Sequence, residues 1–177
     1  ELDAATLDIS GNADIDGTME ADAYTLEGSA FIKVAGTNFT GSLLVGHATS
    51  GTLDAATYNT GVGIAALDAL TAGDHNTAVG GDAGTGITTG TKNTFIGFGA
   101  GRTGASNFGN VGVGYYALYG CQDAGIYNTT LGYYSGVNVS TGDYNVLLGY
   151  QAGDNITSGS GNAVSYTHLR AHETPEH

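Results

Sequence analysis

One phrase of about 17 residues recurs along most of the chain, and this recurrence limits the possible folds more than any other feature. Each copy reads Asn-Thr-x-(Val/Ile/Leu)-Gly-x-x-(Ala/Ser), followed by a variable part and a Thr/Ser pair with Gly. Consecutive copies begin 17 residues apart, except for one interval of 18 residues. The opening asparagines are Asn59, Asn76, Asn93, Asn110, Asn128, Asn145 and Asn162, and Ser42 opens a degenerate first copy. Self-similarity at a fixed period predicts a repeat protein built of stacked units.

The composition indicates short strands separated by turns. Gly contributes 31 of the 177 residues, and the chain has one Pro, no Trp and 11 Tyr. Hydrophobic residues make up 41% and charged residues 12%, whereas a disordered chain would be poor in aromatics and rich in charge. Thr, Val, Ile and Tyr favour strands, and the Gly, Asn and Asp between them favour turns.

The first half of each copy predicts a strand that ends in a bend. The second and fourth positions are apolar or Thr and the eighth is small in most copies, so alternation places these positions on one, inward-facing side. The fifth position is Gly in every copy, which predicts a sharp bend or a close approach of neighbouring backbones. These glycines are Gly46, Gly63, Gly80, Gly97, Gly114, Gly132 and Gly149.

The second half of most copies predicts another short strand and a turn. Its apolar residue is Leu70, Ile87, Val139 or Ile156, with Cys121 at this place in one copy. Each copy would then form one coil of an all-β β-roll or β-solenoid with 17-residue coils. Stacking of the coils also explains the repeated Asn, since side-chain amides at one position can hydrogen-bond along a ladder.

Changes in rhythm predict three segments. Residues 1–36 carry a six-residue repeat, Asp-Ile-x-Gly-x-apolar, and are expected to form a short β-repeat stalk. Residues 37–163 are expected to form a β-roll of about seven coils. From residue 164 onward the rhythm stops, and residues 164–177 resemble the translated adapter of a sequencing library at the end of a metagenomic fragment. We expect this tail to be non-native.

The charge of the chain argues against two classes of partner. The formal net charge is −13, with only four Lys and Arg residues. Nucleic acids and anionic membranes are bound by clusters of basic side chains, which these four scattered residues do not form. We therefore expect neither a nucleic-acid nor a membrane partner.

No constellation of residues predicts catalysis, a cofactor or a metal ion. A glycine-rich stretch in the second full copy lacks the Gly-Lys-Ser/Thr ending of a phosphate-binding loop, and no Gly-x-Ser-x-Gly elbow is present. Asp14 and Asp16 resemble the start of a calcium loop, but Thr25 stands where a bidentate Glu is needed. His168 and His172 have the spacing of helical metal ligands but lie in the tail. We expect no enzyme activity and no cofactor.

Tyrosines are concentrated in the last full copies. The sixth position is aromatic in four consecutive copies, and stacking of the coils would align these side chains into a stripe: Phe98, Tyr115, Tyr133 and Tyr150. One interpretation is a ridge that binds sugar or protein, since Tyr offers an apolar face and a polar hydroxyl. The other, which we favour, is a stripe that packs coil on coil or chain on chain.

Three copies carry a family resemblance: Asn76-Thr-Ala-Val-Gly80, Asn93-Thr-Phe-Ile-Gly97 and Asn145-Val-Leu-Leu-Gly-Tyr-Gln-Ala-Gly153. They resemble the repeats of bacteriophage tail-fibre shafts, of the type that precedes a self-cleaving intramolecular chaperone domain. The coil is also similar to the head β-roll of trimeric autotransporter adhesins, although its 17 residues exceed the adhesin coil. The resemblance covers about residues 5–163 and implies a homotrimer.

The resemblance implies a structural and receptor-binding segment of a phage tail fibre, located in the virion and acting in host attachment without catalysis. Its partners would be further copies of the chain and a host cell-surface receptor, either glycan or protein. One alternative is the head of a bacterial trimeric adhesin on the cell surface. Another is an ice- or carbohydrate-binding β-solenoid, which needs a flat Thr ladder. The Thr row at the second position is interrupted by Val111 and Val146, and the expected alternation turns it inward.

Overall fold

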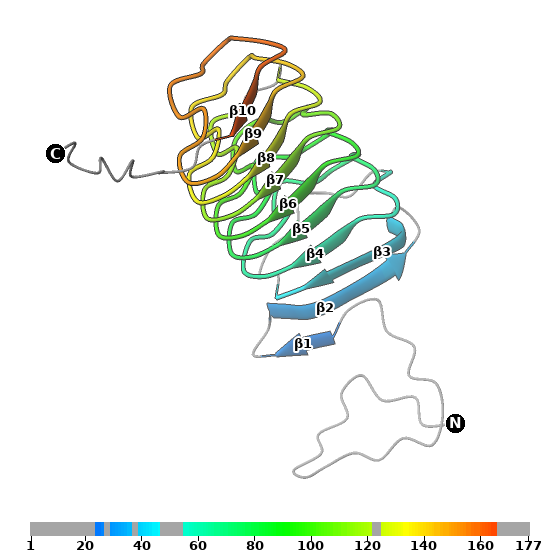
Figure 1. Cartoon of the computed structure of the whole chain (residues 1–177). Coiled ribbons are helices and arrows are strands. Elements are labelled where there is room, and N and C mark those ends of the chain that lie inside the picture. Colours follow the sequence, from blue (N-terminus) through cyan, green and yellow to red (C-terminus); the bar gives the residue numbers. More distant parts are fainter. Residues whose placement is uncertain (1–23, 27–28, 37–38, 47–54, 122–124, 166–177) are drawn as a thin grey trace, which may run out of the picture.

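The computed structural model describes residues 24–26, 29–36, 39–46, 55–121 and 125–165, and these residues form one ten-stranded sheet without a helix (Figure 1). The strands lie in the sheet in chain order. Their bounds are Tyr24–Leu26 (β1), Ser29–Gly36 (β2), Phe39–Val45 (β3), Thr60–Val62 (β4), Thr77–Val79 (β5), Thr94–Ile96 (β6), Val111–Val113 (β7), Thr129–Leu131 (β8), Val146–Leu148 (β9) and Ala163–Ser165 (β10).

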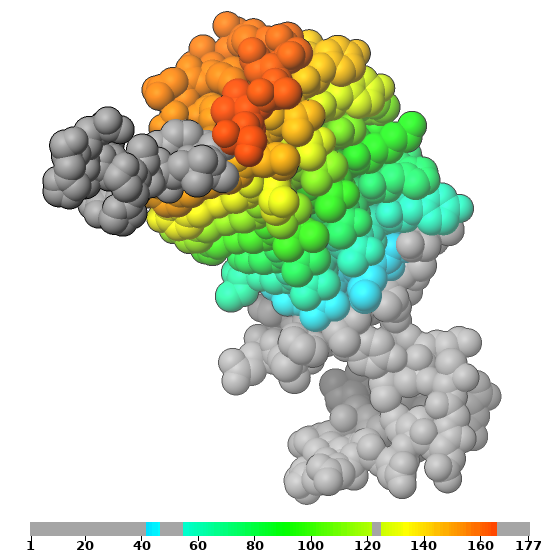
Figure 2. Space-filling view, in the orientation of Figure 1, coloured from blue at the N-terminus to red at the C-terminus, as the bar shows by residue number. Residues whose placement is uncertain are grey.

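From β3 onward the sheet belongs to a parallel solenoid. Each strand pairs with the equivalent strand of the next copy, so that Thr60 lies opposite Thr77 and Thr77 opposite Thr94. β1 and β2 extend the same sheet in antiparallel orientation at its N-terminal edge. Figure 2 shows the successive coils as adjacent bands. The prediction of an all-β solenoid with about seven coils of roughly 17 residues is confirmed.

The opening asparagines form a hydrogen-bond ladder through the interior. Asn76 is 1% exposed, and its Oδ1 accepts from both the backbone N–H and the Nδ2 of Asn93, each at 3.0 Å. Its Nδ2 donates to Oδ1 of Asn59 at 3.0 Å and to the carbonyl oxygen of Gly90 at 2.8 Å. Ser42 begins the ladder, because its Oγ accepts the Asn59 N–H at 2.8 Å. An interior amide such as that of Asn76 therefore joins three coils and also fixes a turn of its own coil.

The ladder changes at Asn110, where the one interval of 18 residues begins. The Asn110 N–H donates to Oδ1 of Asn93 at 3.0 Å, as elsewhere. Its Nδ2 donates to the carbonyl oxygen of Gly125 at 2.8 Å and contacts the buried Sγ of Cys121 at 3.8 Å. The regular pattern resumes at Asn128, whose Nδ2 donates to Oδ1 of Asn110 at 3.2 Å.

The predicted inward direction of the second and fourth positions is wrong. In β5 the middle residue Ala78 is buried, whereas Thr77 is half-buried and Val79 is exposed, and β4, β6 and β8 share this pattern. The third position therefore points inward. The eighth position is buried as expected, for example at Ala83 and Ala100. The in-and-out alternation of side chains along the strand does not continue to the eighth position, because the bend at the fifth position interrupts it.

The size of the inward side chain at the third position is matched by the ninth position of the same copy. Two copies have Gly at the third position and a fully buried Leu at the ninth, Gly61 with Leu67 and Gly112 with Leu118. Three copies have the reverse, Phe95 with Gly101, Thr130 with Gly136 and Leu147 with Gly153, whereas the copy with Ala78 and Gly84 is small at both positions. A methyl group added at Gly153 would lie 2.7 Å from Cδ1 of Leu147, so the two positions compete for one space.

The glycine at the fifth position serves both of the purposes expected for it. From Gly63 onward the φ angle at this position lies between 118° and 143°, a region that L-residues rarely adopt. A methyl group at Gly80 would lie 2.6 Å from the carbonyl oxygen of Gly97 in the next coil. The bend and the close approach of neighbouring coils therefore both require Gly here.

The second strand predicted for each coil is not formed in the part of the chain that the structure describes. The residues between the bend and the next Asn are turns and bends, with isolated bridges that join Phe108 to Thr91 and Ile126. Positive φ angles interrupt any extended run, for example 56° at Asp82 and 61° at Lys92. Backbone hydrogen bonds between coils nevertheless continue through these turns.

The predicted segment boundaries are described only in part. Of residues 1–36, for which a stalk is expected, the structure describes residues 24–26 and 29–36, which form β1 and β2 in the common sheet, and the stalk itself stays a prediction. β10 pairs with β9 as far as Ser165, so the solenoid extends two residues beyond the expected boundary at residue 163. The calcium-like pair Asp14 and Asp16 and the tail from residue 166 lie outside the described residues.

Replacing Asn76 by Ala should lower the free energy of unfolding by about 2–4 kcal/mol, because four buried hydrogen bonds lose a partner. Urea unfolding followed by circular dichroism measures this change. Asn155→Ala is the matched control, since its exposed amide donates to the Asp154 carboxylate, and it should change stability by less than about 0.5 kcal/mol. Equal losses in the two variants would contradict a structural role for the ladder.

The size match between the third and ninth positions predicts coupling between Leu147 and Gly153. Leu147→Gly leaves a cavity and Gly153→Leu overfills the same space, so each single variant should lose about 2–4 kcal/mol. The double variant restores the volume and should be more stable than the sum of the single losses predicts, by about 1 kcal/mol or more. The φ of 66° at Gly153 is close to the 57° at which the chain already places Leu67. Strictly additive losses would contradict the proposed competition for space.

Candidate functional site

The outward side of strands β4 to β9 is an uncharged, largely apolar surface, which we call the sheet face. It consists of the second and fourth positions of six copies: Thr60, Val62, Thr77, Val79, Thr94, Ile96, Val111, Val113, Thr129, Leu131, Val146 and Leu148. The apolar side chains are substantially open to solvent, with exposed fractions of 40% at Ile96 and 53% at Leu131. Contiguous exposed apolar surface of this kind marks an interaction site more often than a solvated one.

The four aromatic residues of the sixth position form the stripe that the sequence predicts, which we call the aromatic ridge. The ring centroids of Phe98 and Tyr115 lie 5.5 Å apart, those of Tyr115 and Tyr133 5.2 Å, and those of Tyr133 and Tyr150 5.5 Å, with interplanar angles of 8–17°. The rings therefore pack coil on coil, as one interpretation expected. They are also exposed, by 41% at Tyr115 and 55% at Tyr150, so their outer surfaces remain open to a partner.

A second group of rings borders the opposite end of the strands. It occupies one of the two positions before several opening asparagines, where Tyr127 stacks on Tyr144 at 5.3 Å and packs edge-on against Phe108. Tyr58 and His75 form a similar pair at 5.0 Å in earlier coils. This stripe is not among the features predicted from the sequence. The recurrence of Tyr-Asn at residues 58–59, 127–128 and 144–145 is the signal that could have shown it.

Behind the ridge lies a third aromatic group, made by Tyr116, Tyr119 and Tyr134. The Tyr116 ring packs edge-on against Tyr119 at 4.9 Å and against Tyr134 at 5.4 Å. Nη1 of Arg102 donates to the Tyr119 hydroxyl at 3.3 Å, and Nη2 lies 3.6 Å from the Asp82 carboxylate. The bond to Tyr119 is the main cause that raises the pKa of Arg102 further, so the cation is retained at every ordinary pH.

Desolvation among these rings raises the pKa of Tyr115 and Tyr134 above the usual value of 10.0. The neighbouring phenols add to the effect, Tyr116 foremost at Tyr115 and Tyr133 foremost at Tyr134. Both phenols therefore remain neutral hydrogen-bonding groups near pH 7.

The described residues contain no group of three His, Cys, Asp or Glu side chains that could hold a metal ion. Within the same residues, no helix is long and apolar enough to cross a membrane. The described carboxylates lie in turns, where Asp74 accepts the Thr57 N–H and Oγ1 at 2.7 Å and Asp143 accepts the Ile126 N–H at 2.9 Å. These two acids join neighbouring coils rather than gather around a common centre.

Alkaline pH should destabilise the solenoid through Tyr115 of the ridge and Tyr134 of the group behind it. The folded chain holds the Tyr115 and Tyr134 protons more tightly than the unfolded chain does, so this stabilisation is complete below about pH 10 and is lost as the pH rises through the raised pKa values. The double variant Tyr115→Phe/Tyr134→Phe should lose less stability than the parent between about pH 9 and pH 12, measured by urea unfolding at each pH. Tyr127→Phe/Tyr144→Phe is the control. An equal reduction of the alkaline loss of stability in this control would contradict the assignment of the effect to Tyr115 and Tyr134.

Comparison with known proteins leaves the family of the chain open. No protein-family model matches the sequence, and no curated protein or solved structure matches it either. A functional assignment therefore depends on the surfaces of the solenoid, of which the sheet face, the aromatic ridge and the tyrosine group behind it are the most distinctive.

Proposed function

We propose that the chain is a structural and receptor-binding segment of a bacteriophage tail fibre, which acts in host attachment as a rigid homotrimer without catalysis. The observation that carries the proposal is the sheet face, an uncharged apolar surface that continues from coil to coil along the stack. The sequence resemblance to tail-fibre shaft repeats supplies the biological setting, with the virion as its location.

Further copies of the chain are the occupants that best suit the sheet face. An identical copy carries the same rows of outward side chains at the same coil spacing, so contacts made at one coil can be repeated at the next. The face contains no Lys, Arg, Asp or Glu, although the whole chain has a net charge of −13. Two such chains can approach through this face without desolvating a charge or placing acidic side chains in contact.

The aromatic ridge provides the receptor-binding part of the proposal. Its stacked rings are held by their neighbours in adjacent coils, so that little further ordering is required on binding. Exposed tyrosines offer both apolar faces and hydroxyl groups to a glycan or protein on the host cell surface. The head of a bacterial trimeric adhesin would use the same surfaces, and a C-terminal membrane anchor in the complete gene would distinguish it.

An ice-binding solenoid is a second candidate because the Thr row faces outward. The alternation of the sequence predicts an inward row, whereas Thr60, Thr77 and Thr94 lie in register on the outward sheet face. Val111 and Val146 still interrupt the row, and the neighbouring fourth position is Val, Ile or Leu. Thermal hysteresis of a monomeric chain would favour this candidate over the fibre.

The mass of the full chain in solution tests the proposal, and light scattering combined with circular dichroism should find a β-rich trimer. The double variant Ile96→Lys/Leu131→Lys places two cations on the sheet face and should give a folded monomer, since both side chains point outward. Thr89→Lys, an exposed turn position away from the sheet face, is the control and should remain trimeric. A folded monomer of the unmodified chain would contradict the proposal.

A further inference from the structure

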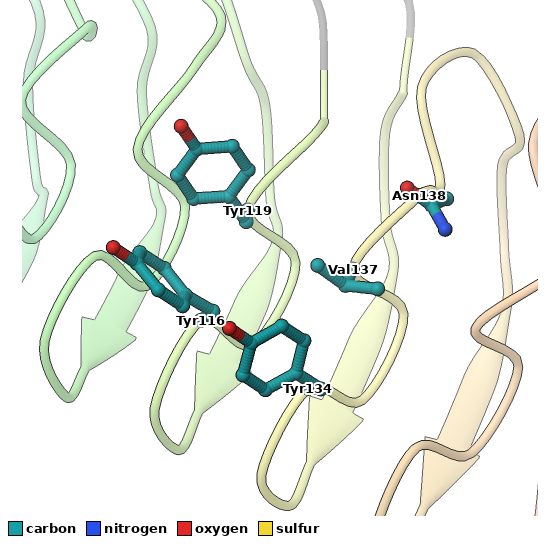
Figure 3. Close-up of a pocket in the computed structure, with 5 residues that line it drawn as sticks. All are labelled: Tyr116, Tyr119, Tyr134, Val137 and Asn138. Carbon is teal, nitrogen blue, oxygen red and sulfur yellow. The ribbon is translucent and has the colours of Figure 1, made fainter.

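A hollow of about 320 Å³ opens in the surface beside the aromatic ridge (Figure 3). Tyr116, Tyr119, Tyr134, Val137 and Asn138, from two consecutive coils, line it. Its volume falls at the lower end of the range for ligand sites in proteins, roughly 300–1,000 Å³. Figure 3 shows the three tyrosine rings gathered on one side of the hollow, with Val137 and Asn138 on the other.

The repeat itself explains why a hollow occurs at this place. Tyr116 and Tyr134 both occupy the seventh position of their copies, and Tyr119 and Val137 both occupy the tenth. The side chain at the tenth position therefore shrinks from Tyr to Val between two adjacent coils, while the seventh position keeps its ring. The step leaves a space above Val137 that is bounded by aromatic walls, and no other pair of described coils combines these residues.

The polar groups around the hollow are few and well positioned. The Asn138 Nδ2 donates to the carbonyl oxygen of Asp154 in the next coil at 2.7 Å, which fixes the amide. Its Oδ1 has no protein donor among the described residues and can accept a hydrogen bond from a ligand. The Tyr119 hydroxyl, which accepts from Arg102 at 3.3 Å, can still donate its own proton. The site thus combines apolar ring faces with one fixed acceptor and several phenol groups.

The electrostatics of the hollow favour a neutral ligand. A cation would be drawn to the tyrosine faces, but the Arg102 guanidinium already lies 5.9 Å from the centre of the Tyr119 ring and would repel it. An anion is disfavoured because Arg102 already pairs with Asp82 and donates to Tyr119, and because the chain has a net charge of −13. A ring with apolar C–H faces and hydroxyl groups at its edge satisfies both features of the site.

We propose that this hollow binds one neutral hexopyranose unit of a glycan, with the sugar ring against the tyrosines and a hydroxyl group donating to Asn138 Oδ1. This inference rests on the proposed host-attachment function and names the chemistry of its receptor. The ridge tyrosines Tyr115 and Tyr133 pack against Tyr116 and Tyr134, so that neighbouring sugar units of the same glycan can continue from the hollow onto the ridge.

Titration of the full chain with methyl glycosides of glucose, galactose, mannose and N-acetylglucosamine tests the proposal. Tyrosine emission is a suitable signal because the chain has no Trp, and saturation-transfer NMR gives a second one. At least one glycoside should bind with a Kd on the order of 1 mM. Tyr119→Ala and Asn138→Ala should each weaken it about tenfold, through loss of a ring wall and of a hydrogen bond. The side chain of Asn138 is exposed, so this variant should keep the fold.

Tyr144→Ala is the matched control, since it removes an exposed tyrosine at the opposite end of the strands and should leave the Kd unchanged. Three results would overturn the proposal: no binding of the four glycosides up to about 50 mM, an equal loss in Tyr144→Ala, or tighter binding of tetramethylammonium than of any sugar. If the chain is a trimer that binds no glycoside, the proposed sugar site is wrong and the proposed fibre function stands. If the chain is a monomer that binds a glycoside, the proposed fibre function is wrong and the proposed sugar site stands.

Discussion

The asparagine ladder is the interaction on which the remaining structure depends. A coil whose only strand is three residues long cannot be held by strand pairing alone, and most of its backbone runs through turns. The buried amides compensate for this, because an interior amide such as that of Asn76 bonds to the coils on either side and to a turn carbonyl of its own coil. All four hydrogen-bonding positions of an interior amide such as Asn76 are satisfied, so the polar group can be buried without a desolvation penalty that exceeds its bonds. The ladder thereby fixes the register of the stack.

With the register fixed by amides and by the glycine bend, the interior side chains can vary from coil to coil. The third and ninth positions exchange a large side chain for Gly between copies, as in Gly61 with Leu67 and Leu147 with Gly153. No described coil holds a large side chain at both positions, and either position can supply the one that is present. Positions on the outside of the coils are under even less constraint. The tenth position, for example, is Thr85, Arg102 and Tyr119 in successive coils.

The sequence was sufficient to predict the architecture but not the direction of the strand side chains. Residues that recur without exception, such as Asn76 and Gly80, identify the period, the ladder and the bend. The inward third position was missed because it ranges from Gly to Phe95, and its regularity becomes apparent only when it is paired with the ninth position. Positive φ angles at residues such as Asp82 and Lys92 were also hidden, since Gly replaces them in only some copies. The ridge was predictable from its single position, whereas the hollow depends on residues from two copies and on side-chain size.

The distribution of charge gives the strongest reason to regard the sheet face as a contact surface. The acidic residues that the structure describes are confined to turns: Asp68, Asp74, Asp82, Asp143 and Asp154. Strands disfavour Asp and favour the polar Thr as well as Val and Ile, so strand propensity alone does not explain why the fourth position is apolar in all six copies of the sheet face. A solvated sheet with open apolar rows would also be prone to association with other sheets. Among the residues that the structure describes, the carboxylates lie outside the strands and leave one continuous apolar face without charge, which is the distribution expected of a contact surface.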